Sequence, residues 1–285
     1  MPATVIDGKE LAARLREEVA TQVASIEEPP GLATLLVGDD PASEIYVRNK
    51  RRLCTQVGMR DLHRHLPADV GQAELASIIT ELNADPAVTG ILLQLPLPKH
   101  LRADDLLALI DPDKDVDGLT EASAGRLALG KPGLRPCTPS GVIRMLDSAG
   151  VDLRGKHAVV IGRSNLVGKP QAQLLLERDA TVSICHRHTA DLAAITRTAD
   201  VLVVAAGVPH LVGADAVKPG ATVIDVGIHR TDTGLCGDVD TDAVAQVAGA
   251  VTPVPGGVGP MTIAMLLWNT VEAAQLRSTE GAATV

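Results

Sequence analysis

Five short apolar segments recur through the second half of the chain, and helix-forming stretches follow most of them. They consist mainly of Val, Ile, Leu and Ala, which suits strands that are buried on both faces. Regular alternation of strands and helices predicts a parallel, doubly wound sheet with right-handed crossovers. The predicted strands cover residues 157–162, 180–185, 200–206, 221–226 and 250–254.

The first half alternates in the same way, so two α/β domains are expected. Asp7 is placed to cap the first predicted helix, and Ser43 the second. The predicted strands are 31–38, 59–66 and 90–95, and the predicted helices are 7–24, 43–57, 72–84 and 103–110. A helix at 260–277 closes the chain, and prolines and glycines indicate a hinge near residues 138–150.

Composition narrows the class of protein. The 285 residues, 46% of them hydrophobic, suffice for two modest domains. A net charge of −9 argues against nucleic acid or an anionic membrane as the main partner. The first residues lack a secretory signal, and the longest apolar stretches are too short to span a bilayer. Four scattered cysteines fit a reducing compartment, so a cytoplasmic protein is expected.

A glycine-bearing turn follows the predicted strand at 157–162, in the segment HAVVIGRSNLVGKP. Gly162 permits a tight turn, and Gly168 allows the next helix to approach the strand closely. The amides at the start of that helix would then meet a pyrophosphate. The spacing is G-x-S-x-x-x-G rather than G-x-G-x-x-G, so an ordinary glycine turn is the alternative.

The end of the next predicted strand bears on the choice of dinucleotide. NAD-specific domains usually carry an acidic residue there, which accepts from the ribose 2′-hydroxyl. This chain has Cys185-His186-Arg187-His188 instead. Arg187, helped by Arg163, can pair with a 2′-phosphate, which predicts NADP; a solvated loop is the alternative. Glycine turns at Gly207 and at Gly227-Ile228-His229 lie where cofactor-facing loops fall in such sheets.

Lys50 lies one helical turn after Tyr46, the only tyrosine of the chain. Tyr46, Lys50, Leu53 and Val57 are spaced four, three and four apart, which places them on one stripe of a helix. Burial would lower the pKa of the lysine and make it a usable acid, base or water-polarising group. A lysine whose amine reaches water is the alternative. Short-chain dehydrogenases also contain Tyr-x-x-x-Lys, but their glycine turn precedes it, whereas here Gly162 follows.

A run of prolines and glycines precedes the last predicted helix, in the segment PVPGGVGP at residues 253–260. Prolines restrict the backbone and glycines free it, so the run prescribes an unusual path. A simple linker is the alternative.

Seven segments occur here in the order found in the bifunctional methylenetetrahydrofolate dehydrogenase/cyclohydrolase family, which the chain resembles over nearly its whole length. They are Tyr46-x-x-x-Lys50, LLQLPLP, PDKDVDG, PCTPSG, GRSNLVGKP, VIDVG and TPVPGGVGPMT. The resemblance implies two α/β domains with a cleft between them, the second a doubly wound Rossmann-type parallel sheet. It implies a catalytic folate-binding domain at 1–140 with a C-terminal helix at 262–285 packing on it, an NADP-binding domain at 141–261, and a homodimer.

The resemblance also assigns roles to residues. Lys50 would be the main catalytic group, tuned by a hydrogen bond with Gln94. Asp117 would bind the amino-pyrimidine edge of the pterin, and Tyr46 would stack against the folate. Pro255, Gly256 and Gly259 are expected to line the same cleft. The expected cofactor contacts are Gly162, Arg163, Ser164, Val167, Gly168, Arg187, Gly207 and Ile228.

The implied activity oxidises 5,10-methylenetetrahydrofolate with NADP and hydrolyses the methenyl product to 10-formyltetrahydrofolate, in one-carbon metabolism. No metal is expected, because His63 and His65 read as a solvent-facing pair. A dinucleotide-binding regulatory module would not need a buried Lys50. Another two-domain dehydrogenase, of the shikimate or amino-acid type, would not explain QLPLP or PVPGGVGP. His229 and Lys169 depart from the residues expected in the family.

Overall fold

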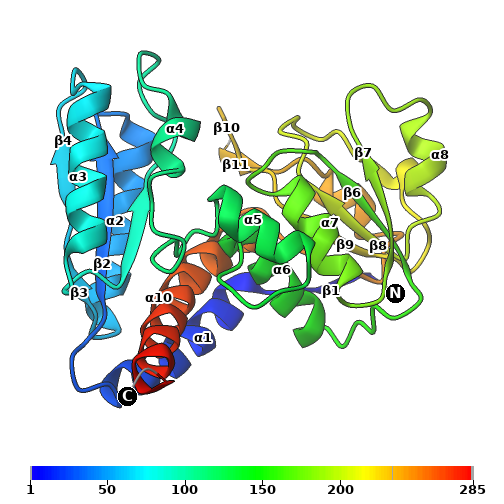
Figure 1. Ribbon diagram of the computed structural model, residues 1–285. Helices are drawn as coiled ribbons and strands as arrows, with labels where there is room; N and C mark the ends of the chain where they lie inside the picture. The colour runs from blue at the N-terminus through cyan, green and yellow to red at the C-terminus, as the bar shows by residue number, and fades with distance from the viewer. Residues whose placement is uncertain (1, 233, 284–285) are drawn as a thin grey trace. The chain divides into compact units, whose positions relative to one another are not determined.

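The computed structural model describes residues 2–232 and 234–283 (Figure 1). The chain divides into a six-stranded unit, residues 1–13 and 138–265, and a four-stranded unit, residues 14–137 and 266–285. Helices α1 (Gly8–Ala24) and α10 (Val258–Ala283) contribute residues to both units. Among the described helices, none has both the length and the apolar character needed to cross a membrane.

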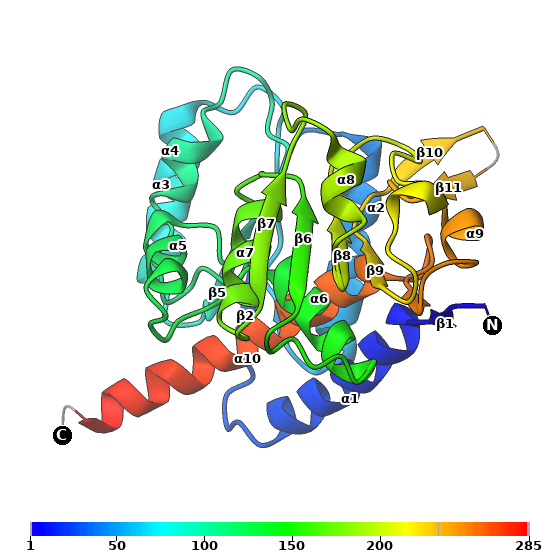
Figure 2. The same cartoon turned by 90° about the vertical axis from the view of Figure 1, so that its right-hand side faces the viewer.

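The sheet of the six-stranded unit is parallel throughout, in the order β1-β12-β9-β8-β6-β7. Its strands are β1 (Thr4–Val5), β6 (His157–Ile161), β7 (Thr181–Cys185), β8 (Val201–Val204), β9 (Thr222–Asp225) and β12 (Ala250–Val251). Figure 2 shows β7, β6, β8 and β9 side by side. The order turns at β6, whose neighbours are the next two strands along the chain, and ligands of doubly wound sheets bind at such a turning point.

Helices and one hairpin complete this unit. The helices are α6 (Cys137–Ser148), α7 (Gly168–Leu176), α8 (Leu192–Thr196) and α9 (Thr241–Val244), with a 3₁₀ turn, η1, at Ala214–Ala216. The antiparallel hairpin consists of β10 (His229–Thr231) and β11 (Gly234–Cys236). The segment predicted to contain a hinge therefore forms mostly a helix, α6, and the division between the units falls after its first residue.

Branched aliphatic residues account for the strands of this sheet. All of β8 and the last four residues of β6 are buried, and Val159, Leu202 and Val223 belong to one core cluster. The prediction of a parallel, doubly wound α/β sheet is confirmed. Strand β12 is shorter than the predicted 250–254, because Pro253 has no amide hydrogen to extend the ladder.

The four-stranded unit is also parallel, with β2 paired to the three other strands. Every residue of β2 is buried. The strands are β2 (Gly31–Val37), β3 (Arg60–Asp61), β4 (Arg64–Leu66) and β5 (Gly90–Leu93), and the helices are α2 (Pro41–Gln56), α3 (Gln72–Ala84), α4 (Ala103–Leu107) and α5 (Glu121–Ala128). Helix α3 has the predicted range, whereas α4 ends earlier than expected.

Two further local predictions in this unit are wrong. The cap of α2 is Asp40, whose Oδ2 accepts from the amide of Ser43 at 2.8 Å, so the helix begins at Pro41. Proline fits the first helical turn because its missing amide hydrogen is not needed there. Residues 59–66 form two short strands instead of one. At the break, the imidazole Nδ1 of His63 lies 3.0 Å from the carbonyl of Thr34.

Candidate active site

Helix α2 carries Lys50 on its buried side. Lys50 and Leu53 are buried, as is Val57 at the C-cap, and Tyr46 is half-buried, whereas the three arginines of the helix are exposed. The predicted stripe is therefore confirmed. The exposed fraction of Lys50 is only 6%, which argues against an amine that reaches freely into water.

Two contacts fix the amine nitrogen of Lys50. Its Nζ donates to Gln94 Oε1 at 3.0 Å and lies 4.8 Å from the centroid of the Tyr46 ring. Gln94 directly follows β5, and its Nε2 donates to the carbonyl of Leu95 at 2.6 Å. Because the amide NH₂ is engaged there, the amide oxygen faces the lysine.

Burial lowers the pKa of Lys50 below its ordinary value, and the negative charge of Asp117 partly opposes this shift. Gln94 is a neutral acceptor, so it orients the amine without adding a charge that would restore the pKa. A lysine in this environment has more neutral amine near pH 7 than an exposed one. It can therefore exchange a proton in either direction.

The loop that leads to Asp117 is built around a buried neighbour, Asp115. The Asp115 carboxylate accepts from the amides of Leu119 at 3.1 Å and Thr120 at 2.8 Å, and from Ser123 Oγ at 2.7 Å. Gly118 has a φ of +69°, and a Cβ there would lie 2.5 Å from the nitrogen of Pro136. These contacts prescribe the backbone path on either side of Asp117.

Asp117 interacts with Lys50 and with Cys137. Burial raises the pKa of the Asp117 carboxyl, and the positive charge of Lys50 opposes the shift. The Cys137 side chain hydrogen-bonds to Asp117, and its Sγ lies 3.2 Å from the carbonyl oxygen of Val116. Burial and the Asp117 charge raise the pKa of Cys137 well above its ordinary value, so this thiol stays protonated.

Cys137 and Asn269 were not predicted as site residues. Asn269 is buried on α10, and its Nδ2 donates to the carbonyls of Val116 and Arg135, both at 2.8 Å. It thereby ties the residue before Asp117 to the segment that leads to Cys137. Two features of the sequence could have pointed to these residues: the PCTPSG motif, and an asparagine within an otherwise apolar helical stretch, MLLWN.

The predicted residues fall into two groups. Tyr46, Lys50, Gln94 and Asp117 all belong to the four-stranded unit. The remaining predicted residues belong to the six-stranded unit: Pro255, Gly256, Gly259 and every expected cofactor contact.

The glycine turn after β6 requires its glycines. Gly162 has a φ of +130°, and a Cβ there would lie 2.2 Å from the carbonyl oxygen of Ala205. Gly168 opens α7, and a Cβ there would lie 2.2 Å from the carbonyl oxygen of Gly162. Ser164 Oγ accepts from the amide of Val167 at 3.1 Å, which shapes the loop. The glycines therefore leave the backbone at the start of α7 uncovered by side chains, at the turning point of the sheet. Backbone amides at such a helix start are suited to binding a pyrophosphate.

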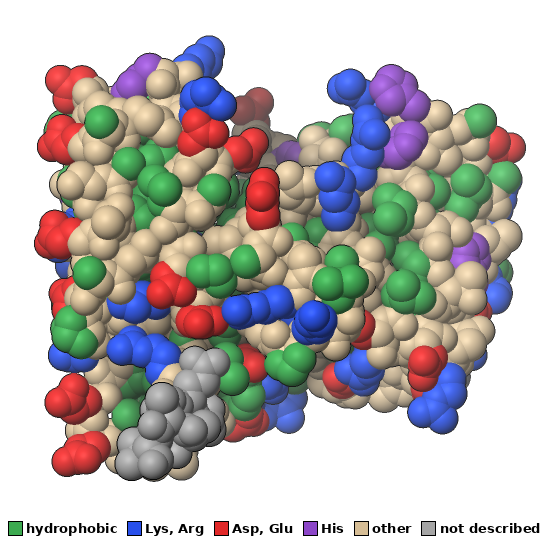
Figure 3. All heavy atoms as spheres, viewed as in Figure 1, with side chains coloured by type: hydrophobic (Ala, Val, Ile, Leu, Met, Phe, Trp, Pro, Cys, Tyr) green, Lys and Arg blue, Asp and Glu red, His purple; other side chains and the backbone are tan. Residues whose placement is uncertain are grey.

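Basic residues follow the two adjacent strands β6 and β7. The amide of Gly162 donates to the carbonyl of Cys185 at 2.9 Å, so Arg163 and the loop with Arg187 start from neighbouring strand ends. Both arginines are exposed, and Arg187 Nε lies 3.1 Å from His188 Nε2. Figure 3 shows basic and histidine side chains gathered at the upper right, over the loop after β7. This cluster can accept a phosphate.

The proline- and glycine-rich run ends in α10, which begins at Val258, two residues before the predicted start. The amide of Lys9 donates to the carbonyl of Gly256 at 3.0 Å. A Cβ at Gly8 would lie 1.8 Å from the carbonyl oxygen of Gly257. This loop therefore packs against the start of α1, and Ile228 Cδ1 would lie 3.7 Å from a Cβ at Gly259.

The two histidines weighed as metal ligands each contact a backbone carbonyl. His63 Nδ1 lies 3.0 Å from the carbonyl of Thr34, and His65 Nε2 lies 2.9 Å from that of Gly38. Asp39 and Glu44 place ligand atoms within 4.8 Å of His65, and both acids are exposed. Sequence spacing did not reveal these two neighbours.

Comparison with known proteins covers both units. Residues 6–117 match the family described as tetrahydrofolate dehydrogenase/cyclohydrolase, catalytic domain. Residues 136–278 match the NAD(P)-binding domain of the same family.

Individual relatives agree over the full length. The chain is 62% identical to bifunctional protein FolD 2 of Frankia alni, over 99% of each chain. The crystal structure of the bifunctional FolD enzyme from Campylobacter jejuni superposes with a TM-score of 0.94 at 48% identity, covering 96% of this chain and 99% of that one. The Trypanosoma brucei FolD structure, complexed with NADP cofactor and inhibitor, has a TM-score of 0.93 at 40% identity and covers 98% and 99%. The chain therefore belongs to the tetrahydrofolate dehydrogenase/cyclohydrolase family.

Proposed function

We propose that the protein oxidises 5,10-methylenetetrahydrofolate to 5,10-methenyltetrahydrofolate with NADP⁺, and hydrolyses that product to 10-formyltetrahydrofolate in one-carbon metabolism. The observation that carries the proposal is the buried Lys50, oriented by Gln94 and interacting with Asp117. Family membership makes both reactions the expected pair.

Lys50 is assigned to the hydrolysis. Water must attack the methenyl cation, and a proton must then move as the ring opens. The amine of Lys50, with its lowered pKa and its fixed direction toward Gln94 Oε1, can polarise the water and carry that proton. The oxidation needs less acid–base help, because the adjacent nitrogen lone pair stabilises the cation; alignment of the reactants dominates there.

Asp117 and Tyr46 are assigned to binding the folate. A carboxylate offers two acceptor oxygens, which match the two donors on the amino-pyrimidine edge of a pterin. The Tyr46 ring is only half-buried, so a face of it can stack on the ligand. The assignment of Pro255, Gly256 and Gly259 as folate contacts rests on the family resemblance.

NADP⁺ is assigned to the carboxyl edge of the six-stranded sheet. The residues present fit a dinucleotide, because side chains at Gly162 and Gly168 would fill the cradle at the start of α7. When bound, NADP⁺ supplies the hydride acceptor. Arg163 and Arg187 would pair with the 2′-phosphate, and no acid stands at the end of β7 to repel it.

Three further assignments are proposals. A homodimer and functional domains at 1–140 with 262–285 and at 141–261 rest on the resemblance, and a cytoplasmic location rests on the scattered cysteines and the first residues of the sequence. Sedimentation of the purified protein tests the first of these. A sedimentation coefficient of a monomer at micromolar concentration would contradict it.

A spectrophotometric assay tests the function. The protein is given methylenetetrahydrofolate with NADP⁺ or with NAD⁺, and the absorbance of the methenyl product is followed. We expect turnover with NADP⁺ and a lower rate with NAD⁺. No methenyl product with either cofactor would refute the dehydrogenase assignment, and an unchanged cofactor preference after Arg187→Glu would refute the role of that arginine.

A further inference from the structure

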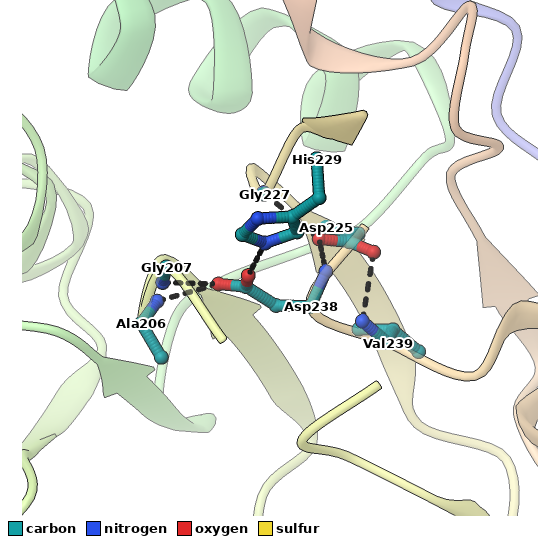
Figure 4. A network of polar contacts seen from close by, with 7 residues as sticks. All are labelled: Ala206, Gly207, Asp225, Gly227, His229, Asp238 and Val239. Carbon is teal, nitrogen blue, oxygen red and sulfur yellow. Dashed lines mark hydrogen bonds and ion pairs between the residues drawn. The ribbon is translucent and has the colours of Figure 1, made fainter. Parts of the chain in front are cut away.

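Two buried carboxylates lie at the carboxyl edge of the six-stranded sheet (Figure 4). Asp225 is the last residue of β9 and is 1% exposed, and Asp238 follows the hairpin β10–β11 and is fully buried. Burying charged groups is unfavourable unless they are paired and hydrogen-bonded, so their partners indicate what they do.

Asp238 binds two separate loops. Its Oδ2 accepts from the amides of Ala206 at 2.6 Å and Gly207 at 2.8 Å, directly after β8. Its Oδ1 accepts from His229 Nε2 at 2.7 Å, and His229 opens β10, after the turn that follows β9. One carboxylate thus ties the loop after β8 to the loop after β9, as Figure 4 shows.

Asp225 fixes the backbone on either side of Asp238. Its carboxylate accepts from the amides of Asp238 at 3.0 Å, Val239 at 2.9 Å and Gly227 at 2.9 Å. A Cβ at Gly227 would lie 2.4 Å from Asp238 Oδ1, so the glycine leaves the room that the His229 contact needs. The position of Asp238 is therefore defined by backbone on several sides.

We propose that His229 and Asp238 are a positioning pair for the dinucleotide, which pre-forms the loops after β8 and β9. The proposal rests on the proposed function, which assigns NADP⁺ to this edge of the sheet, and on the family resemblance, which implies Gly207 and Ile228 as cofactor contacts. Ile228 is 57% exposed beside His229, and the Gly207 amide donates to Asp238, so the contacts of this carboxylate set the paths of both loops. Loops that are already ordered lose less conformational freedom on binding, so the dinucleotide binds more tightly.

The length of the side chain at position 229 allows the hydrogen bond to Asp238 to be tested separately from the volume of the side chain. Asp238 Oδ1 is the acceptor in this contact, and Nε2 is its donor. A glutamine carries its NH₂ about as far from the backbone as Nε2, whereas an asparagine ends one bond earlier. His229→Gln is expected to keep the contact, and His229→Asn and His229→Leu to lose it.

Calorimetric titration with NADP⁺ tests the proposal on these three variants of the full-length protein. Loss of a hydrogen bond to a charged group corresponds to roughly ten-fold weaker binding, expected for His229→Leu and His229→Asn. His229→Gln is expected to bind within about three-fold of the wild type. Hydrolysis of methenyltetrahydrofolate needs no hydride acceptor, so it serves as a second readout in the absence of NADP⁺ and is expected to stay unchanged.

His157→Leu is the matched control. His157 is a partly buried histidine at the start of β6, at the opposite edge of the sheet, and its Nε2 lies 2.9 Å from Ser183 Oγ. Its replacement also removes a histidine hydrogen bond from this sheet and is expected to leave NADP⁺ affinity unchanged.

Three results would overturn the proposal. The first is wild-type affinity in folded His229→Leu or His229→Asn, and the second is an equal loss in His157→Leu, which would indicate general destabilisation. In the third, the wild type hydrolyses methenyltetrahydrofolate but gives no heat with NADP⁺ and does not reduce it. That result refutes the cofactor assignment itself, and the positioning role falls with it; the first two leave the proposed function intact.

Discussion

The amine nitrogen of Lys50 contacts Gln94 Oε1 and the Tyr46 ring, and its side chain is almost fully enclosed. Methionine has a similar length and carries no charge, so Lys50→Met is expected to fold without leaving an unpaired buried cation. We expect hydrolysis of methenyltetrahydrofolate to fall at least about 100-fold, the usual range for loss of an acid–base group. The decay of methenyl absorbance measures it, and NADP⁺ affinity is expected to persist.

Arg48→Met controls for loss of a positive charge on the same helix, because Arg48 is exposed. It is expected to hydrolyse at the wild-type rate. A folded Lys50→Met protein with wild-type hydrolysis would remove the proposed role of Lys50.

Gln94→Glu tests how the neutral amide tunes Lys50. Burial lowers the pKa of Lys50, and a carboxylate 3.0 Å away would raise it again by favouring the charged form. The neutral amine would then appear only at higher pH. Because Lys50 accepts the proton in the proposed hydrolysis, the rising limb of kcat/KM for hydrolysis is expected to move to higher pH, by about one unit or more.

Gln56→Glu adds the same carboxylate to the exposed end of α2 and is expected to leave the profile in place. An unshifted profile in folded Gln94→Glu would show that the charge state of Lys50 does not control hydrolysis.

At the scale of elements, periodic apolar stretches were predicted well and polar ones poorly. Helix α3 and the central strands β6 and β8 follow from their apolar pattern, because burial alone determines them. The hairpin β10–β11 was missed, since its residues are half-exposed or exposed and show no alternation. The loop containing Asp117 was recognised as a loop, but its buried anchors could not be read from an acidic run.

One such anchor, Lys114, caps helix α3. Its Nζ donates to the carbonyls of Leu82 at 3.0 Å, Asn83 at 2.7 Å and Asp85 at 2.8 Å, where the helix ends. A positive charge there also complements the helix dipole. Lys114→Met leaves these carbonyls without the donor, and we expect a loss of about 2–3 kcal/mol in the free energy of unfolding, measured in urea.

Lys99→Met provides the comparison, because Lys99 is exposed on a neighbouring loop. Its effect is expected to stay within about 0.5 kcal/mol. Equal stability of the two variants would mean that Lys114 contributes no net stabilisation.

At the scale of the whole molecule, the candidate site combines residues that local patterns cannot connect. The stripe on α2 was enough to orient Lys50 inward. Its pairing with Gln94 was predicted only from the family resemblance, because no local pattern links α2 to the end of β5. Asn269 is more distant still: it reaches Val116 and Arg135 from the last helix, through contacts that only the folded chain creates.

The titration of Asp225 is expected to make the free energy of unfolding of the whole molecule depend on pH. Burial raises the pKa of Asp225 to about 6, although three backbone amides oppose the shift. The folded protein then binds this proton more tightly than the unfolded chain, so the associated stabilisation is present below about pH 4 and is lost as the pH rises to 6. Asp225→Asn cannot titrate, so its penalty in the free energy of unfolding is expected to shrink between pH 4.5 and 7, by up to about 2–3 kcal/mol.

Asp200→Asn is the control of opposite sign, since the hydrogen bond from Lys218 lowers the pKa of Asp200. The stabilisation from that carboxylate is present at neutral pH and is lost as the pH falls, so the penalty of this substitution is expected to shrink toward acid. Urea unfolding followed by circular dichroism at four pH values measures both penalties. If the penalties of the two substitutions changed with pH in the same direction, a raised pKa at Asp225 would be contradicted. Only a proton that is held more tightly in the folded state makes the penalty shrink as the pH rises.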